Sequence, residues 1–429
     1  MDAKLSLWER LFLEERPSIG LAFFRLAVAF TVGAHLIPTL LHLDDNYLST
    51  AFKETNSSFF TPGVIELAAR SPDGLVYFMT IFFYVTLAFF AAGLFSQISC
   101  LLMTACCYYF YALNSLHIGT LSYDILLVTL FLMCVTGYHG DFFSLDALRV
   151  ADPLAYKRKR PFFVQRLLQL QVASTFFYTG LCKVSARGNW LTDNPVYYLL
   201  NSTPESVVKH FPLRETVARH PDLCWWIGIG IVGSELALPF FLFIKRTRAL
   251  AIAYGFFFHV MLLVTLHVPT IFFFLFPPQL LLFIDPETVV HWIEKKRRQN
   301  ELRGQERLVY DGHCRFCIGS VQRIQVLDLF RRTALVNYQE WEDVTKIDPR
   351  LTRDLCHSRM QLLAENGKLY EGFFAFRHLA GKIVLLWPLA PFLYLPGMSW
   401  AGSKTYDFIA KNRYLFHNKK TCTDNACFR

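Results

Sequence analysis

Charged side chains are scarce in this chain of 429 residues, where Asp, Glu, Lys and Arg together make up 18% of the sequence. Soluble domains carry about 25% of these residues. The deficit lies in the first two-thirds of the chain, while hydrophobic residues reach 53% overall and phenylalanine alone occurs 42 times. This composition is not typical of a soluble protein. It indicates a chain that lies largely in a lipid bilayer.

Two further features are missing from the sequence. Residues 1–18 mix basic and acidic side chains, and no small-residue cleavage site follows a short apolar run, so we expect no cleavable signal peptide and a first apolar segment that stays as an anchor. No nucleic-acid-binding motif is visible, so nucleic acid is not expected as a partner. The net charge of +9 is interpreted instead as attraction to anionic lipid.

Long apolar runs are abundant in residues 1–298. A transmembrane helix needs about 20 mostly apolar residues, and the run LVYFMTIFFYVTLAFFAAGLF (75–95) meets this length. We therefore predict a multi-span membrane domain over 1–298, an α-helical polytopic membrane bundle of about eight transmembrane helices. The predicted spans are 19–42, 75–95, 97–114, 121–138, 162–182, 224–244, 248–267 and 269–285.

Basic residues in short loops predict the orientation of these spans. With eight spans, the stretches YKRKR (156–160), KRTR (245–248) and EKKRR (294–298) lie on one side together with the basic N-terminus. Short loops rich in Lys and Arg face the cytoplasm. We therefore expect both the N- and the C-terminus of this multi-pass membrane protein to be cytoplasmic.

The composition changes after Arg298. A polar linker (299–306) precedes a normally charged domain (307–416), and a cysteine-containing tail (417–429) follows. Alternation and helical periodicity in the domain predict the order βα, β, then ββα, with a hairpin turn at Asn366-Gly367. That order indicates a small α/β thioredoxin-like domain.

The motif YDGHCRFC (310–317) places Cys314 and Cys317 where the first strand of this domain turns into its first helix. A helix N-terminus favours an anion, and the thiolate is the nucleophile of disulfide exchange. Cys314 would attack and Cys317, one turn later, would resolve the mixed disulfide. Asp311 could accept a proton or simply close the turn, and the turn role is favoured.

Other interpretations of the two cysteines remain open. A structural zinc site would need a second pair of ligands, for which Cys422 with Cys427, or Cys356 with His357, are candidates. The protein would then be a non-enzymatic membrane scaffold that binds zinc. Two cysteines that merely pack in a core are a third interpretation. The pairing at the start of a helix favours a redox dithiol, so we predict no metal site.

Several segments of residues 308–414 resemble the DCC-type thiol-disulfide oxidoreductase family. They are VYDGHCRFC, LLAENGKLYEGFFAFRHL (362–379), WPLAPFLYLPG (387–397) and YDFIAKNRYLF (406–416). The resemblance implies that Asp311, Cys314 and Cys317 are the active-site residues. No proline directly precedes the strand near Met360, where thioredoxins place one that contacts substrate.

Lys183 is the notable ionisable residue of the predicted fifth span. Gln171, Thr175, Thr179 and Lys183 are spaced by four residues, which lines them along one ridge of a helix. A lysine that extends toward the membrane surface is the simpler interpretation. A desolvated amine that acts as a base is the alternative.

The stretch TGLCKVSARGNWLTDNPVYYLL (179–200) is similar to the vitamin K-dependent gamma-carboxylases. Their bacterial relatives share the horizontally transferred transmembrane domain, and residues 17–285 resemble it. The resemblance implies that Lys183 deprotonates the reduced form of a quinone cofactor, such as vitamin K hydroquinone, and that His117 and His259 line its pocket. In the segment GDFFSLD (140–146), Asp141 stands where the animal enzymes have a histidine, and their large extracytoplasmic domain is absent.

These observations together predict an integral membrane oxidoreductase. Its dithiol would exchange disulfides with a protein partner or pass electrons to a quinone, and its bilayer-embedded domain would handle a quinol or a lipid. The alternative is a carboxylase-like lyase or epoxidase that acts on glutamyl peptides.

Overall fold

The computed structural model describes residues 6, 8–53, 62–114, 120–185, 189–202, 213–266 and 270–413. The chain divides into two compact units. We call the first, Met1–Asp146 with Arg158–Pro286, the membrane unit. The second, Ala147–Lys157 with Glu287–Arg429, is called the dithiol unit.

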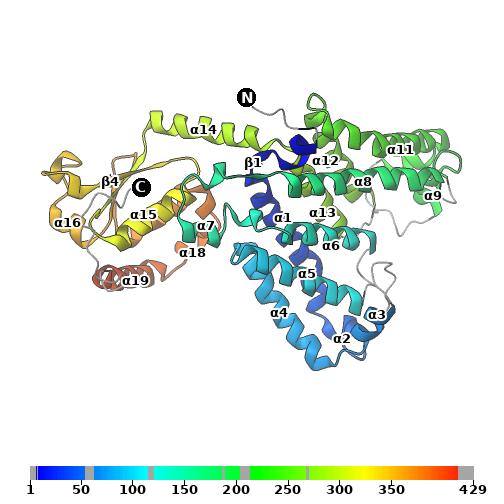
Figure 1. Cartoon of the computed structure of the whole chain (residues 1–429), viewed down its shortest axis with the longest axis horizontal. Helices are drawn as coiled ribbons and strands as arrows, with labels where there is room; N and C mark the ends of the chain where they lie inside the picture. Colours follow the sequence, from blue (N-terminus) through cyan, green and yellow to red (C-terminus); the bar gives the residue numbers. More distant parts are fainter. Residues whose placement is uncertain are drawn as a thin grey trace. The chain divides into compact units, whose positions relative to one another are not determined.

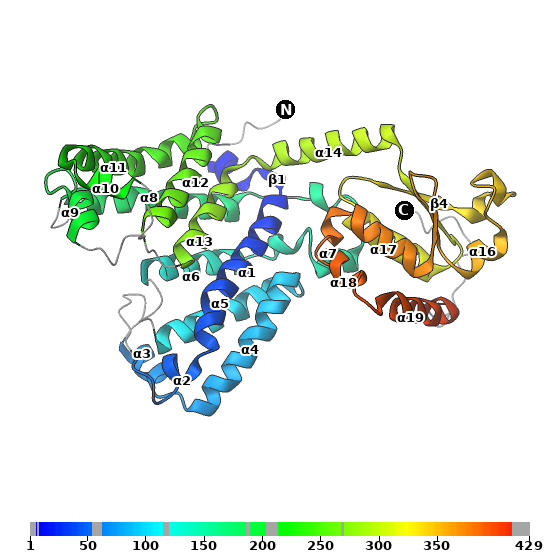
Figure 2. The ribbon, with the colours of Figure 1, turned by 180° about the vertical axis from the view of Figure 1, so that it is seen from behind.

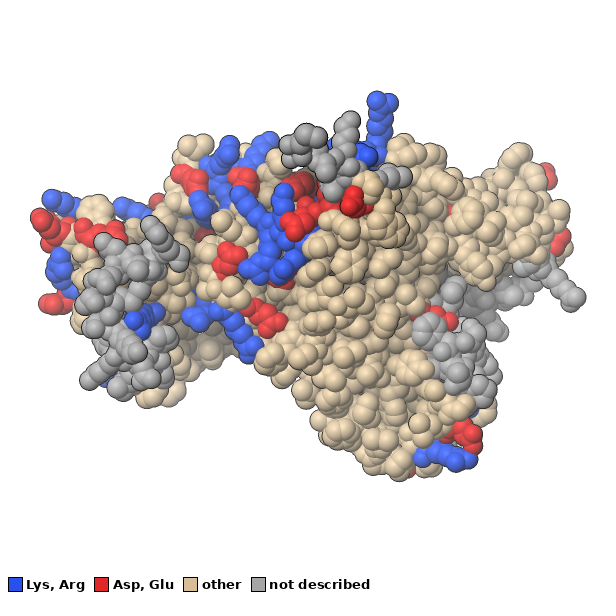
Figure 3. Space-filling view, viewed as in Figure 1, with Lys and Arg blue, Asp and Glu red and all other residues tan. Residues whose placement is uncertain are grey.

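Five helices of the membrane unit are long and apolar enough to cross a bilayer, counted over the described residues. Many of their large apolar side chains are exposed, which suits contact with lipid rather than water. In Figure 3, the surface around α4 and α5 is almost free of charged side chains. The five helices are α1 (Ile19–Leu40), α4 (Asp73–Ala92), α5 (Ser96–Leu113), α11 (Pro221–Phe243) and α12 (Arg248–Thr265).

The count of eight spans is not confirmed. Helix α6 (Thr120–Cys134) is short, and α8 (Phe163–Ser185) is long enough but carries glutamines that donate hydrogen bonds to main-chain carbonyls of other helices. Helix α13 (Thr270–Leu280) contains two prolines and is followed by an 81° bend at the start of α14 (Pro286–Arg303). The residue before a proline is biased away from helix, which accounts for the break before Pro286.

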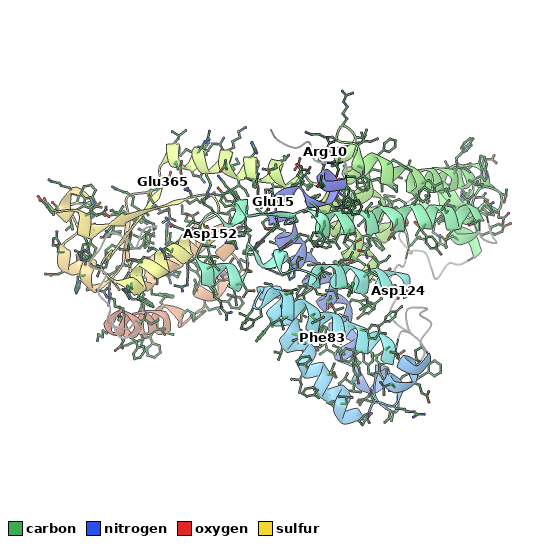
Figure 4. The ribbon with its side chains drawn as sticks, in the orientation of Figure 1. Arg10, Glu15, Phe83, Asp124, Asp152 and Glu365 are labelled. Carbon is green, nitrogen blue, oxygen red and sulfur yellow. The ribbon has the colours of Figure 1, made fainter. Side chains whose placement is uncertain are left out.

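The helices of the membrane unit pack against one another as neighbours along a chain of contacts. Helix α1 contacts α4 and α13, α5 lies between α4 and α6, and α8 runs alongside α11 (Figure 1). The core of this packing is rich in aromatic rings, such as Phe83, which Figure 4 labels and which meets Phe110 edge-on at 6.2 Å. Its smaller elements are β1 (Glu15–Pro17), α2 (Leu43–Asn46), α3 (Pro62–Ala69), β2 (Lys159–Pro161), α9 (Pro195–Ser202) and α10 (Arg214–Ala218).

The dithiol unit contains a four-stranded sheet of order β4-β3-β5-β6. Strands β3 (Glu306–Tyr310) and β4 (Thr333–Asn337) are parallel, while β5 (Gln361–Leu363) and β6 (Leu369–Glu371) add antiparallel. Helix α15 (Arg315–Leu327) connects the parallel pair, and α17 (Gly372–Lys382) follows the hairpin, as Figure 2 shows from behind. The predicted order βα, β, ββα is therefore present. Helices α16 (Arg353–Ser358), α18 (Ala390–Leu393) and α19 (Met398–Asn412) complete the unit.

Two segments of the dithiol unit differ from the predicted boundaries. Residues 299–303, which the sequence predicts as linker, form the last part of α14. Strand β3 begins three residues later, at Glu306. Residues 147–157, which include most of α7 (Leu145–Val150), belong to this unit although the sequence places them between two spans.

Candidate active site

Cys314 lies at the N-terminus of helix α15. Its backbone is extended (φ −94°, ψ 108°), and its sulfur accepts a hydrogen bond from the N–H of Cys317 at 3.4 Å. Sulfur here occupies the place that a serine or aspartate oxygen takes in an ordinary helix cap. The helix N-terminus therefore presents an N–H donor and its dipole to the sulfur of Cys314.

The two thiols differ in acidity. The Cys317 thiol donates to the Cys314 sulfur, and together with the Cys317 N–H and the charge of Arg413 it outweighs burial and lowers the pKa of Cys314 to about 6. The same hydrogen bond, followed by burial, raises the pKa of Cys317. Both are free thiols, 2% and 8% exposed respectively. The environment therefore favours the thiolate form at Cys314 and the protonated form at Cys317.

Asp311 closes the turn that leads from β3 to Cys314. Its Oδ1 accepts from the N–H of His313 at 3.0 Å, and its carbonyl accepts from the N–H of Cys314 at 3.3 Å. Gly312 next to it has no room for a side chain, because a Cβ would lie 2.3 Å from the amide of Asn337. The turn role inferred from sequence thus matches the hydrogen bonds of Asp311.

Arg413 brings a buried positive charge to this turn. Its Nη2 lies 3.6 Å from Oδ2 of Asp311 and donates to the carbonyl of His357 at 2.7 Å. Both side chains of the ion pair are less than a tenth exposed. Arg413 was missed as a site residue because it follows Cys314 by about a hundred positions, at the end of α19.

Tyr406 of α19 contacts Met360, the residue that precedes strand β5. Its hydroxyl accepts from the N–H of Met360 at 3.0 Å. Burial raises the pKa of Tyr406, and the nearby Cys317 adds to this effect. The main-chain N–H of Met360 therefore has the hydroxyl of Tyr406 as its acceptor.

Lys183 forms an ion pair inside the membrane unit. Its Nζ donates to both carboxylate oxygens of Glu235 on α11, at 2.9 and 2.7 Å, and lies 5.5 Å from the centre of the Trp190 ring. The Glu235 side chain is 8% exposed and that of Lys183 is 22% exposed. An intramembrane ionisable residue usually pairs with another, and the partner of Lys183 is Glu235.

Close packing of α8 and α11 allows this ion pair. Gly180 lies one turn before Lys183, and a Cβ there would come 2.9 Å from Leu236. On the predicted ridge, Thr175 donates to the carbonyl of Gln171, and Thr179 donates to that of Phe176. The threonines therefore bond within α8, and only Lys183 reaches a side chain of α11.

Of the two predicted pocket histidines, the structure describes His259. His259 is 2% exposed, binds the carbonyl of Gly255 through Nδ1 at 2.7 Å and stacks on Phe276 with ring centres 5.6 Å apart. These contacts do not overlap with those of Lys183. His117 lies outside the described residues.

Asp141 forms an ion pair with Arg160 and a hydrogen bond with Ser18. Arg160 donates to both of its oxygens at 2.8 Å, and Ser18 donates to Oδ2 at 2.9 Å. These bonds fasten β1 and β2, which pair antiparallel, to the segment after α6.

The zinc interpretation finds no ligand set in the described ranges. Within them, no group of three or more His, Cys, Asp or Glu side chains is arranged to hold a metal ion. Cys422 and Cys427 lie outside those ranges.

Comparison with known proteins agrees with both resemblances. A family model for the DCC1-like thiol-disulfide oxidoreductase domain matches residues 308–419, and the model for the HTTM domain matches residues 15–287. No curated protein and no solved structure matches the chain. The HTTM match covers more than half of the sequence, so this protein belongs to the HTTM domain family and carries a DCC1-like thiol-disulfide oxidoreductase domain after it.

Proposed function

We propose that this protein is an integral membrane thiol-disulfide oxidoreductase whose active groups are Cys314 and Cys317. The single observation that carries the proposal is the position of Cys314 at the N-terminus of α15, where its sulfur accepts from the N–H of Cys317 at 3.4 Å. At neutral pH, a thiol with a pKa of about 6 is mostly thiolate, which is the reactive form. A thioredoxin-like unit with this arrangement is suited to reducing a disulfide in a partner protein.

The reaction follows from the positions of the two sulfurs. The Cys314 thiolate attacks one sulfur of the partner's disulfide, which forms a mixed disulfide and releases the partner's other sulfur as a thiolate. The Cys317 thiol loses its proton to that thiolate and attacks Sγ of Cys314. The partner leaves as a dithiol, and the protein retains a Cys314–Cys317 disulfide that an external dithiol must reduce again.

Trapping of the mixed disulfide tests this order of attack. Full-length C317S should accumulate a covalent adduct with a disulfide-containing peptide, whereas C314S should form none. C356A, which removes the buried thiol of Cys356 in the same unit, serves as the matched control and should exchange normally. Adduct formation by C314S would overturn the assignment.

Quinol or lipid handling is the second part of the proposal and concerns the membrane unit. Helices α11 and α12 line a groove of about 350 Å³ with mostly apolar walls, including Leu238, Phe241 and Tyr254. Such walls suit a prenyl or acyl chain. Lys183, however, forms an ion pair with Glu235. A lysine held in an ion pair is not available as a base, so no proton-transfer step through a quinone is assigned.

Substrate assays separate the alternatives for the membrane unit. If Lys183 acts on vitamin K hydroquinone, K183Q should abolish oxidation of the quinol by the full-length protein. Incorporation of labelled bicarbonate into a glutamyl peptide would favour the carboxylase-like lyase. Retained quinol oxidation in K183Q would reject Lys183 as the base.

We also propose that both termini are cytoplasmic, as the basic loops indicate. The basic loops lie on one side if α6, α8 and α13 cross as well as the five long apolar helices, which gives the even number of crossings that this orientation needs. Glu365, labelled in Figure 4, lies in the turn between β5 and β6. A membrane-impermeant maleimide should label E365C in inverted vesicles and not in intact cells, and the opposite pattern would reject the orientation.

A further inference from the structure

The segment 147–157 and helix α14 enclose a basic hollow in the dithiol unit. Tyr156 is almost fully buried there, and Arg297 donates to its hydroxyl while the guanidinium lies 4.5 Å from the ring centre. The hollow has a volume of about 240 Å³. Typical drug-sized sites measure about 300–1,000 Å³, so this one suits a group smaller than a nucleotide.

The charges that line the hollow do not balance. Four cations, Lys157, Arg297, Arg298 and Arg331, face two carboxylates. Lys157 pairs with Glu294, and Arg331 pairs with Glu301 at 2.7 Å. The two neighbouring arginines of α14 remain without a carboxylate at ion-pair distance in the described part of the chain.

Arg297 is the more informative of the two arginines. It is only 6% exposed, and its Nε, also buried, has no hydrogen-bond partner among the described residues. Leaving a buried charged donor unsatisfied is costly. An anion in the hollow would accept from this atom and offset the positive charge.

An adjoining hollow of about 270 Å³ is a poorer site for an anion. Arg297, Glu301 and Arg331 line it as well, but Asp328 adds a second carboxylate, so two cations face two negative charges. Asp328 is already satisfied, because its two oxygens accept from the N–H groups of Arg332 and Thr333 at 3.0 and 2.7 Å. The surplus of positive charge is therefore larger in the first hollow.

We propose that the hollow between Tyr156, Arg297 and Arg298 binds a phosphate group, and that an anionic phospholipid supplies it. Guanidinium groups bind phosphate through paired, charge-assisted hydrogen bonds. Both chain segments that form the hollow connect directly to the membrane unit, since Arg158 follows Lys157 and Pro286 precedes Glu287. Trp292, on the same helix and half exposed, is of a type enriched at membrane surfaces.

Two soluble probes distinguish the source of the phosphate. Full-length protein in a neutral detergent would be titrated with dihexanoyl phosphatidylglycerol and, separately, with inorganic phosphate, and binding would be followed by calorimetry. Tighter binding of the lipid supports a headgroup site. Equal or tighter binding of inorganic phosphate would overturn the lipid assignment and leave a site for free phosphate.

Matched variants show whether the hollow is responsible. R297Q and R298Q should each weaken binding roughly ten- to hundredfold, because each removes a charge-assisted hydrogen bond. R303Q changes the same charge on an exposed position of α14 outside the hollow and should bind normally. Arg298 is exposed, so R298Q keeps the test valid if R297Q fails to fold. No binding of either probe, or equal binding by all variants, would refute the site.

Discussion

Replacing Cys317 by alanine removes the group that contributes most to the low pKa of Cys314. The Cys317 thiol is the largest cause of that low value, while the backbone N–H of residue 317 and the charge of Arg413 are smaller causes. The variant C317A therefore loses the thiol donor and keeps the smaller contributions. The variant C317S retains a hydroxyl donor at the same position and is the matched control.

The structure sets the size of the expected effect. With a pKa of about 6, about 90% of Cys314 is thiolate at pH 7, against about 3% for a free cysteine of pKa about 8.5. The reactive fraction can therefore fall by up to about thirtyfold at pH 7 if every favourable contribution is lost. In C317A the midpoint should rise from about 6 toward the free value without reaching it, and in C317S it should rise less.

Alkylation of Cys314 measures this midpoint. Reduced full-length protein is given short pulses of iodoacetamide over a pH series, and the modified Cys314 peptide is quantified by mass spectrometry. Because Cys314 is 2% exposed, absolute rates will be low, and only the midpoint is compared. A wild-type midpoint close to that of a free cysteine, or identical midpoints in wild type and C317A, would refute the reasoning.

Three further predictions concern buried contacts. R413Q should lower the free energy of unfolding by about 3–5 kcal/mol, because it leaves Asp311 buried without its charge partner; urea denaturation should show that the double variant with D311N loses less than the sum of the single changes. G180V should cost about 1–3 kcal/mol through overpacking between α8 and α11, and an unchanged melting temperature in detergent would contradict the close approach. K183Q and E235Q should each lower that temperature, while the double variant loses less than their sum.

The dithiol end of the fold could be predicted from local sequence. Strand β3, the turn at Asp311 and the start of α15 are consecutive, so alternation and helical periodicity suffice to place Cys314 at a helix N-terminus. Arg413 could not be placed in this way. Its approach to Asp311 depends on how α19 packs against α17, which no short-range pattern encodes.

For the membrane unit, the sequence predicts the general character but not the arrangement of the helices. Its apolar character follows from composition, but the number of spans does not. Glutamines in α8 donate hydrogen bonds to other helices, and prolines lie inside α13, so hydrophobicity alone does not decide whether these segments cross the membrane. Spacing by four correctly placed Gln171 and Lys183 on one helix. Their partners, the carbonyl of Ile125 and the carboxylate of Glu235, come from other helices and required the packed structure.

The cysteines of α5 bear on whether the two units exchange electrons. A relay along this helix would need sulfurs that form and break bonds with one another in turn. Cys106 and Cys107 are adjacent in sequence and so point to different sides of the helix, while Cys107 contacts the sulfur of Met103 at 3.8 Å and Cys100 contacts the carbonyl of Leu130 at 3.5 Å. All three are fully buried free thiols, an environment that makes a cysteine a packing residue. The electrons that reduce the Cys314–Cys317 disulfide are therefore better supplied by an external dithiol than by transfer through α5.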